Sequence, residues 1–296
     1  MTGITIRPGR IEDLDEIRSF TVDTFPWGDY VGREFPNWLD RADQLAMVGI
    51  DEGGTPIAVA RVALLSDAEA WLSGVRIHPE HRRKGIGSEM NEHGVNWARE
   101  RGARVIRLAT EDVNTPARNQ VEKLGFRAVA RFVLAERRLE RVPAGAGIAS
   151  NGGRRLTGTE RLDLAPSAEA DPAYLVWSTG DHARVGHQLY AHQGWSFRQL
   201  KPTDLVVAAK ARKLWTSPSA WVIAEEEKAD DEIWVPLFIT TIEDADRAVT
   251  ALIDHVQEHN ASRVAVMIPR IDWLEEALQR QRFELVHPNY IYEKAL

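Results

Sequence analysis

The most informative stretch of the sequence is Val75-Arg-Ile-His-Pro-Glu-His-Arg-Arg-Lys-Gly-Ile-Gly-Ser88. Its first residues alternate as in a strand, and a turn with two glycines then opens a helix. The first backbone N–H groups of a helix lack intrahelical partners, and the helix dipole favours negative charge at that end. Arg82, Arg83 and Lys84 add positive side chains. The stretch therefore predicts a phosphate site.

The two glycines of this turn narrow the kind of site. Gly85 and Gly87 permit backbone angles and a close ligand approach that a Cβ would block. The turn lacks the GxxxxGK[ST] pattern of a P-loop and the GxGxxG pattern of a dinucleotide site. A different kind of phosphate-bearing ligand is therefore indicated.

The segments on either side predict a regular order of strands and helices. The order is strand, helix, three strands, helix, strand, helix, strand. The predicted strands cover 4–7, 45–50, 56–65, 71–77, 105–109 and 128–139, and the predicted helices cover 12–20, 87–101 and 116–124. An aromatic, turn-rich stretch over 25–38 fits no simple period and could line a pocket or pack a loop.

These features resemble the GCN5-related N-acetyltransferases over about residues 3 to 165. The family signature R/Q-x-x-G-x-G/A is matched by Arg82, Gly85 and Gly87, after a strand that ends in hydrophobic-x-Pro. A later Asn-x-x-Ala helix that ends in Lys-Leu-Gly-Phe is matched by Asn114, Ala117 and 123–126. The resemblance implies that acetyl-coenzyme A lies between two splayed parallel strands, here 71–77 and 105–109.

The resemblance also implies which residues hold this co-substrate. Backbone groups around Val75, Arg76 and Ile77 would bind the pantetheine arm, and Asn114 with Ala117 would border the cofactor. The pyrophosphate would lie on the glycine turn, formed by Arg82, Arg83, Lys84, Gly85, Ile86, Gly87 and Ser88.

The catalytic groups depart from the family pattern. Many members protonate the departing thiolate with a tyrosine four residues before the glycine of the Leu-Gly-Phe turn, and this chain has Val121 there. Water or another tyrosine such as Tyr30 would have to substitute. The positions that commonly hold the base are Trp71 and Ser73, which are not bases, so Glu69 on the same strand face becomes the first candidate and Asp112, just after the second splayed strand, the second.

The second half of the chain echoes the first. Residues 102–108 are matched by 261–267, and the helix end at 123–126 is matched by 280–283, which indicates a diverged duplication. The counterpart of the glycine turn carries Glu243, Asp244 and Asp246 in place of cations and lacks glycines, so we expect no coenzyme A site there.

We therefore predict an α/β (α+β) fold of two such domains. Each is a mixed, mostly antiparallel sheet with a central splayed parallel pair, flanked by helices. The predicted domains are 1–165, with the intact motif, and 195–296, which is degenerate, joined by a connecting helix region over 166–194. A loop rich in glycine over 142–155 predicts a hairpin between 131–140 and 154–164.

Composition bounds the function. The 296 residues are 44% hydrophobic, enough for two cores of about 150 residues each. A formal charge of −7 disfavours nucleic acid as a partner, and the absence of cysteine excludes disulfides and thiolate metal sites. No leader and no apolar run of about 20 residues is found, so we expect a cytoplasmic protein with no membrane partner.

One histidine pattern suggests a metal. His255-Val-Gln-Glu-His259 matches the HxxEH arrangement that places two histidines one helical turn apart for zinc. The apolar period of the surrounding helix leaves both near its polar side, so we predict surface histidines and no metal site.

The predicted function is an acetyl-coenzyme A-dependent N-acetyltransferase that acts on an amine of a small molecule or peptide by direct attack. The alternative is an acyl-coenzyme A sensor or partner-binding module that has lost its catalytic groups. The acceptor, the acyl length and the choice between monomer and homodimer stay open.

Overall fold

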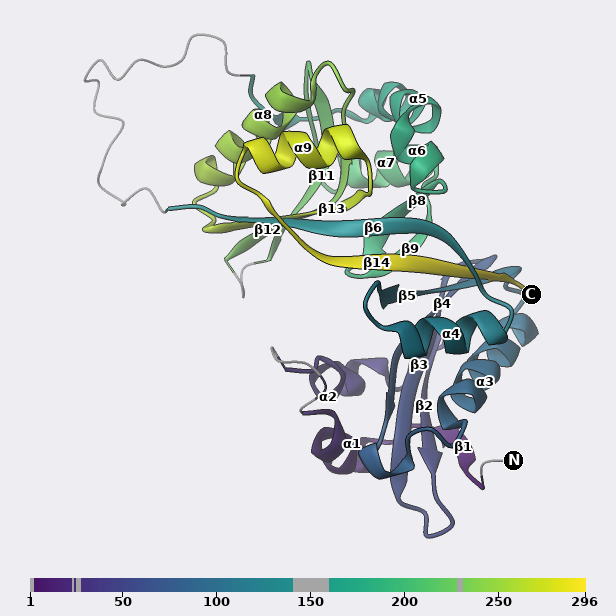
Figure 1. Cartoon of the computed structure of the whole chain (residues 1–296). Coiled ribbons are helices and arrows are strands. Elements are labelled where there is room, and N and C mark those ends of the chain that lie inside the picture. Colours follow the sequence, from purple (N-terminus) through teal and green to yellow (C-terminus); the bar gives the residue numbers. More distant parts are fainter. Residues whose placement is uncertain (1–2, 23, 25–27, 141–159, 228–230) are drawn as a thin grey trace. The chain divides into compact units, whose positions relative to one another are not determined.

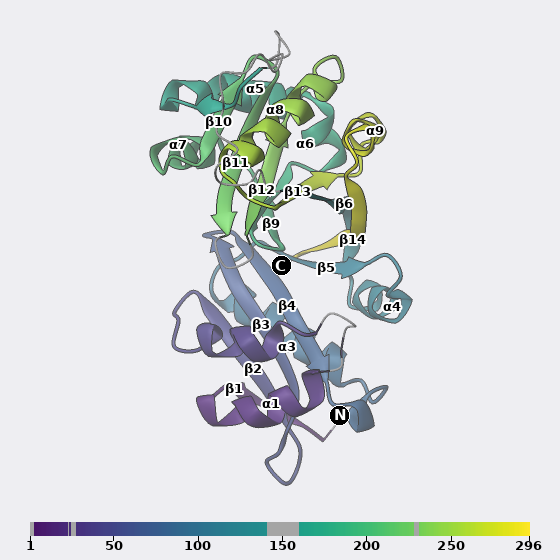
Figure 2. The ribbon, with the colours of Figure 1, turned by 90° about the vertical axis from the view of Figure 1, so that its left-hand side faces the viewer.

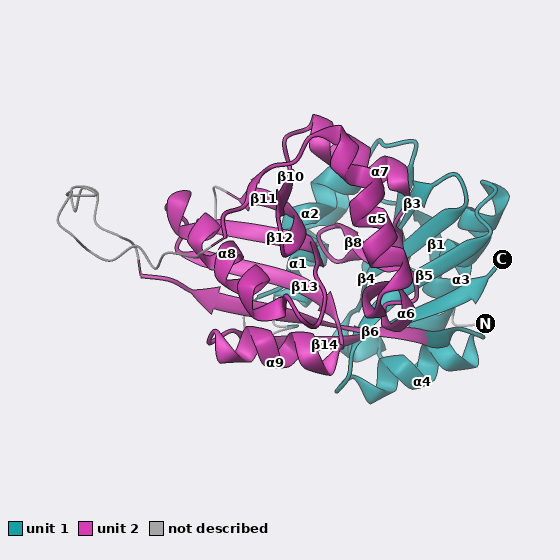
Figure 3. Cartoon of the chain, turned by 90° about the horizontal axis from the view of Figure 1, so that it is seen from above, with its two compact units in different colours: residues 1–128, 291–296 teal, residues 129–290 magenta. Residues whose placement is uncertain are grey.

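The computed structural model describes residues 3–22, 24, 28–140, 160–227 and 231–296. The chain forms two compact units, residues 1–128 with 291–296 (unit 1) and residues 129–290 (unit 2) (Figure 3). Strands β6 (Arg127–Arg138) and β14 (Glu284–Ala295) supply residues to both. Unit 1 ends at Ala128, whereas the sequence predicts a domain boundary at residue 165. The boundary lies earlier because β6 pairs with β13 (Arg263–Pro269) of unit 2.

The elements of unit 1 follow the predicted order as far as the helix predicted over 116–124, with an additional short helix over 31–34. The strand predicted over 128–139 lies mostly in unit 2, and the end of β14 completes the sheet instead. The strands of unit 1 run β1-β2-β3-β4-β5 followed by the end of β14. They are β1 (Thr5–Pro8), β2 (Gln44–Ile50), β3 (Pro56–Ser66), β4 (Glu69–Ile77) and β5 (Val105–Glu111). Its helices are α1 (Leu14–Thr21), α2 (Val31–Glu34), α3 (Ile86–Glu100) and α4 (Thr115–Lys123), with 3-10 turns at Ile11–Asp13, Phe35–Trp38 and Pro79–His81.

The sheet of unit 1 is covered on both faces (Figure 1). Alternate residues of β2 pack in opposite directions: Ala46 and Val48 join a core with α1 and α2. On the other face α3 approaches so closely that a Cβ at Gly94 would lie 2.5 Å from Leu72 Cδ2. Glycine at 94 therefore sets the distance between α3 and the sheet.

The end of the chain completes unit 1. Residues 291–295 of β14 lie beside β5 (Figures 1 and 2). Ile291 and Tyr292 have no exposed surface, and Lys294 Nζ donates to the Leu124 carbonyl at 2.6 Å. A strand from the far end of the sequence is therefore part of this core.

Removal of residues 291–296 should unfold unit 1. Loss of two fully buried side chains costs about 2–5 kcal/mol each, comparable to the whole stability of many domains. Thermal melting and limited proteolysis of the shortened chain should show an unstable first unit, whereas removal of Leu296 alone should have a small effect. A melting curve for the six-residue deletion that matches the parent would contradict this.

Unit 2 contains strands and helices arranged in a similar order. Beside β6 and β14, its strands are β7 (Asp163–Leu164), β8 (Leu189–Gln193), β9 (Ser196–Gln199), β10 (Leu214–Ser217), β11 (Ala220–Glu227), β12 (Glu232–Ile239) and β13. Its helices are α5 (Ala170–Thr179), α6 (Asp181–Val185), α7 (Pro202–Lys210), α8 (Ala245–Glu258) and α9 (Asp272–Arg280), with a 3-10 turn at Ser167–Glu169. The sheet runs β14-β6-β13-β12-β11-β10-β7, and β8 pairs with β9 separately.

The two faces of the second sheet have separate cores. Helices α8 and α9 contribute to one core with residues of β6, β11, β12 and β13. Helices α5 and α7 contribute to the other, so part of the predicted connecting region over 166–194 is packed into unit 2. Within that region α5 ends at Thr179 and α6 ends at Val185, each directly before a glycine.

The predicted hairpin after β6 is wrong for the described residues. β6 pairs with β13 from Phe132 to Arg138, and β7 pairs with β10. The turn residues of the loop indicated a local reversal, but each flanking strand finds a more distant partner. Residues 141–159 lie outside the described part of the chain.

The predicted surface position of His255 is also wrong. Its side chain is 2% exposed and its ring lies 4.3 Å from Trp215 and 4.2 Å from His259, between centroids. Burial lowers the pKa of His255 to about 4, and burial lowers the pKa of His182 to about 4 as well. Among the described residues no group of three His, Asp or Glu side chains is placed to hold a metal ion.

The two buried histidines should make folding sensitive to mild acid. Their folded pKa of about 4 lies below the unfolded value of 6.5, so the unfolded chain binds more protons between these pH values. The free energy of unfolding should therefore fall as pH drops from 6.5 towards 4, by on the order of 3 kcal/mol per histidine. Urea denaturation at several pH values measures this.

A double variant tests whether these two histidines cause the pH dependence. A protein with His182→Phe and His255→Phe should lose most of this pH dependence above pH 4, whereas His93→Gln should keep it. If the free energy of unfolding changes equally with pH in the double variant and the parent, these histidines are not the cause.

Candidate functional site

The central parallel strands of unit 1 separate part-way along their length. β4 and β5 pair only from Glu69 opposite Val105 to Trp71 opposite Arg107. β4 then continues to Ile77 without pairing to β5. The splay predicted between 71–77 and 105–109 is therefore present. The edges of β4 and β5 that face it carry backbone N–H and C=O groups that take no part in the pairing of these two strands.

A bulge in β4 lies where the strands separate. Arg61 of β3 pairs with Ser73 and Val59 with Arg76, so two residues of β4, Gly74 and Val75, oppose one residue of β3. Gly74 has φ of +67°. A Cβ there would lie 2.7 Å from Trp38 Cη2, so glycine lets the indole pack on the bulge.

The turn after β4 has the geometry of an anion cradle. Arg83 and Gly85 have positive φ, +63° and +85°, on either side of Lys84, and α3 begins at Ile86. No described group accepts a hydrogen bond from the backbone amides of Arg83 to Gly87. Alternating left-handed residues at a helix N-terminus direct amides to one side, where they bind phosphate.

The positive side chains predicted for this turn surround it. Arg82, Arg83 and Lys84 are all exposed, and Arg82 Nε donates to the Ile77 carbonyl at 3.2 Å. Ile86 is 2% exposed and anchors the first turn of α3. The predicted residues 82–88 are thus brought together in one turn.

Gly87 has a packing role as well. A Cβ at this position would lie 2.8 Å from Nε2 of Gln120, on α4. Because that atom ends a flexible side chain, it could move, so packing alone does not require glycine here. The close approach between the first turn of α3 and α4 brings the cradle near the second helix of the predicted cofactor region.

Asn114 and Ala117 form the N-cap of α4. The Asn114 Oδ1 atom accepts a hydrogen bond from the Ala117 amide at 3.2 Å, and Asn114 is exposed. This contact satisfies one of the free amides at the helix start. The pair predicted to border the cofactor thus determines where α4 begins.

Arg76 holds the aromatic loop to β4. Its guanidinium donates to Asp29 Oδ2 at 2.5 Å and to Oδ1 at 3.2 Å, and it lies 5.5 Å from the Tyr30 ring centroid. The Asp29 side chain is 1% exposed. The backbone of Arg76 was predicted to lie at the pantetheine arm, and its guanidinium holds Asp29, the residue next to Tyr30.

Tyr30 lies at the bulge. Its ring packs edge-on against the Trp38 ring, with 6.3 Å between the ring centroids. The residue is 40% exposed, yet burial around its hydroxyl raises the pKa of Tyr30 above 10. The phenol is therefore protonated at neutral pH and can donate a proton. Residues 25–27 of the aromatic stretch lie outside the described part.

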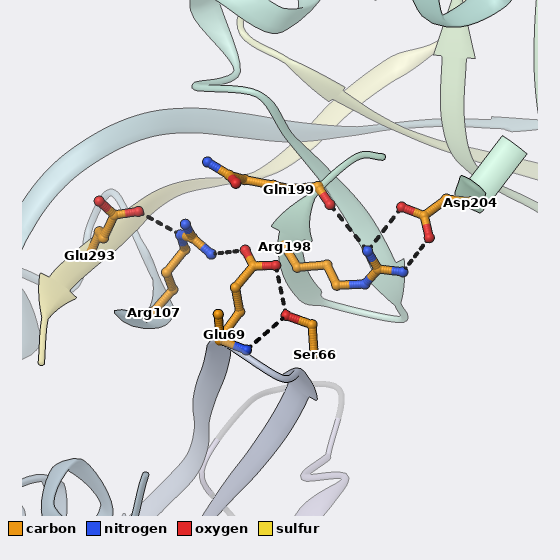
Figure 4. Close-up of polar contacts among 8 residues, drawn as sticks. Ser66, Glu69, Arg107, Arg198, Gln199, Asp204 and Glu293 are labelled. Atoms are coloured by element: carbon orange, nitrogen blue, oxygen red, sulfur yellow. Dashed lines mark hydrogen bonds and ion pairs between the residues drawn. The ribbon is translucent and has the colours of Figure 1, made fainter. Parts of the chain in front are cut away.

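Glu69 lies at the closed end of the parallel pair (Figure 4). It is 4% exposed, accepts from Arg107 Nη1 at 2.6 Å and from the Ser66 hydroxyl at 3.0 Å. Arg107 Nε also donates to Glu293 at 2.7 Å. Five residues of strand, roughly 16 Å, separate Glu69 from Gly74. This position favours a structural role for Glu69 over contact with a reacting amine.

Unit 2 supports that interpretation. Glu232 begins β12 opposite Arg263 of the parallel strand β13, and Arg263 Nη1 lies 2.9 Å from its carboxylate. β12 also carries a bulge, at Val235 and Pro236, after which the parallel pairing stops. A glutamate paired with an arginine of the neighbouring strand thus starts both parallel pairs.

The turn that follows β12 differs from the cradle of unit 1. No residue from Thr240 to Asp246 has positive φ, and all of them are described. Asp244 is paired with Arg247, and Asp246 with Arg280 at 2.9 Å. The second turn therefore has acidic groups held by arginines in place of a nest of amides.

Sequence reasoning missed Arg61, Trp38 and Asp29. The first two contact each other across β3 and the loop, with the Arg61 guanidinium carbon 6.0 Å from the Trp38 centroid. The signal for Arg61 in the sequence was that it is the one charged residue in the apolar run Pro56–Ser66, and charged side chains are seldom buried without a partner.

No described helix is long and apolar enough to cross a membrane.

Sequence comparison places these features among known proteins. Residues 12–126 match the Acetyltransferase (GNAT) family. Streptothricin acetyltransferase of Streptomyces lavendulae is 32% identical over 90 residues, 29% of this chain and 46% of that protein. Mycothiol acetyltransferase of Mycobacterium sp. (strain JLS) is 24% identical over 224 residues, 74% of this chain and 64% of that protein. The chain thus spans about half to two thirds of these relatives.

Solved structures extend the likeness in fold to the whole chain. A GCN5-related N-acetyltransferase from Sphaerobacter thermophilus has a TM-score of 0.67 at 11% identity, covering 99% of this chain and 95% of that one. A tandem GNAT protein from the clavulanic acid biosynthesis pathway has a TM-score of 0.56 at 13% identity, covering 99% and 98%. At these identities the likeness concerns the fold.

Proposed function

Because residues 12–126 belong to the acetyltransferase (GNAT) family, we propose that this chain transfers an acetyl group from acetyl-coenzyme A to the amine of a small molecule or peptide. The observation that carries the proposal is the amide cradle at 83–87, placed where β4 ends and the strands have separated. A pyrophosphate and a peptide-like pantetheine arm fit these two features.

In this proposal each part of the site binds one part of the co-substrate. The amides of 83–87, with Arg82, Arg83 and Lys84, bind the pyrophosphate. The free backbone edge at Val75 and Ile77 hydrogen-bonds the amide groups of the pantetheine arm as a neighbouring strand would. The N-terminal turn of α4 at Asn114 and Ala117 borders the cofactor.

The chemical step needs one proton donor and one proton acceptor. The acceptor amine attacks the thioester carbonyl carbon and gives up a proton to solvent, and the carbon–sulfur bond breaks. Tyr30 donates the proton that converts the departing thiolate to a thiol, and its phenolate recovers a proton from water. A raised pKa keeps Tyr30 protonated for this role. Glu69 is assigned to structure, because it is held by Arg107.

A non-catalytic sensor is the alternative prediction. It would require the cradle but not a phenol beside the bulge, so the position of Tyr30 against Trp38 at the bulge supports catalysis. The deciding assay follows thiol release from acetyl-coenzyme A with a panel of amines. Tight coenzyme A binding without thiol release from any amine would favour the sensor.

Substitution at Gly87 tests the cradle. Gly87→Glu should weaken coenzyme A binding by roughly tenfold or more, because a carboxylate would face the pyrophosphate. Gly87→Ala should change the dissociation constant by about threefold or less, since the Gln120 amide can move away. Isothermal titration with coenzyme A measures both, and thermal melting checks folding. Equal affinities in Gly87→Glu and the parent would place the site elsewhere.

Substitution at Tyr30 tests the proton donor. Tyr30→Phe should lower kcat by about 10²-fold or more and leave the KM for acetyl-coenzyme A almost unchanged. Because the pKa of Tyr30 is raised by burial, the parent rate should decline only at a pH above the range in which an ordinary phenol ionises, and the variant should lack this decline. Tyr174→Phe, on α5, is the control. A parental kcat in Tyr30→Phe would assign proton donation to another group.

A further inference from the structure

Arg61 is a partly buried cation beside the proposed reaction centre. It lies on β3 opposite Ser73, one residue before the bulge, and it is half-buried. Trp38, which packs on Gly74 and on Tyr30, also contacts the Arg61 guanidinium. Tyr30, Trp38 and Arg61 therefore surround the same bulge within unit 1.

The Arg61 side chain is held in one orientation. Its Nε donates to Gln44 Oε1 at 2.8 Å, and Gln44 Nε2 donates to the Asn37 carbonyl at 3.0 Å. Gln44 is 6% exposed, so its amide is fixed inside the unit. A guanidinium has five N–H donors, and this contact uses one. Among the described residues no hydrogen-bond partner of Nη1 or Nη2 is found, so these two groups can serve as donors to a ligand.

No described carboxylate lies within ion-pair distance of Arg61. The neighbouring arginines of the unit differ: Arg76 is paired with Asp29, and Arg107 is paired with Glu69 and Glu293. Burial lowers the pKa of Arg61, which reflects the cost of removing its charge from water. An anion supplied by a ligand would offset that cost.

The surroundings suit a single negative charge. Arg41, Asp43 and Glu34 lie near enough to act on Arg61 electrostatically, and the two carboxylates would repel a dianion such as a phosphate monoester more strongly than a monoanion. A carboxylate is planar, carries one charge and matches the fork of a guanidinium with two parallel hydrogen bonds.

We propose that Arg61 binds a carboxylate of the acceptor, so the substrate is an amine that also bears a carboxylate, of the amino acid type. This inference rests on the proposed acetyl transfer, because Tyr30 marks where the amine reacts. Arg61 is then a specificity residue that orients the acceptor, and Gln44 and Trp38 are the residues that position Arg61.

Matched acceptors test the proposal. Thiol release is measured with the common α-amino acids and with their amides, which keep the amine and lose the negative charge. The parent should prefer the best free acid over its amide by about tenfold or more in kcat/KM, the range expected for a charge-assisted pair. Equal use of acids and amides would overturn the role of Arg61 and leave acetyl transfer standing.

Variants then assign the preference to one residue. Arg61→Ala should raise the KM for the free acid by about tenfold or more, with little change in kcat and little change for the amide. Arg61→Lys should keep part of the preference, because it retains the charge and loses the fork. Arg99→Ala removes the same charge from an exposed site on α3 and should behave as the parent. A similar loss for acid and amide in Arg61→Ala would show a structural effect.

A binding measurement separates this inference from the proposed function. Isothermal titration with N-acetyl amino acids and N-acetyl amino acid amides, in the presence of coenzyme A, needs no turnover. Binding of an acid that its amide does not share, lost in Arg61→Ala, would support the carboxylate site even if no amine is acetylated. If none of the acids binds at millimolar concentration, the carboxylate site is wrong.

Discussion

The structure of unit 1 depends on the early end of one parallel ladder. β4 and β5 share a register for three residues, and the bulge at Gly74 and Val75 then turns β4 out of that register. Because backbone groups need hydrogen-bond partners, the separated edges are suited to a ligand that resembles a strand. The cradle at 83–87 lies beyond the open end, and Tyr30, Trp38 and Arg61 surround the bulge. The role proposed for each of these residues depends on how near it lies to the point where β4 and β5 separate.

The closed end of the same ladder is held by buried charges. Arg107 is 2% exposed and lies between Glu69 and Glu293. Such a group is costly to bury and stabilises little by itself, but removal of one partner leaves an uncompensated charge. We infer that the ion pairs of Arg107 with Glu69 and Glu293 keep β4 and β5 in register up to Trp71. The catalytic prediction for Glu69 came from its residue type and its place on the strand face, and the pairing with Arg107 favours a structural role instead.

The two units repeat more than strand order. Arg7, Arg10 and Asp13 recur in spacing as Arg198, Lys201 and Asp204. In both, the arginine donates two hydrogen bonds to the aspartate, which also accepts one from the backbone amide three residues earlier. Figure 4 shows the pair of Arg198 and Asp204. The bulge in the fourth strand and the glutamate at its start recur too. Only unit 1 has left-handed residues in the following turn, so the copies diverged where a pyrophosphate would bind.

The sequence alone determined the order of elements in unit 1, the splayed pair, the turn at 82–88 and the repeat in the second half, because each depends on local period and on glycine at defined positions. Tertiary structure decided the rest. β6 and β14 exchange partners that lie more than a hundred residues apart, so the predicted hairpin after β6 does not form among the described residues. His255 is buried because Trp215 covers the helix face that its period left polar. Arg61 and Tyr30 both contact Trp38, and Asp29 with Arg76 joins the loop that carries Tyr30 to β4; the pattern of neither segment contains that pairing. Local sequence specifies which backbone forms, whereas the partner of a buried charge is set by long-range packing that spacing cannot encode.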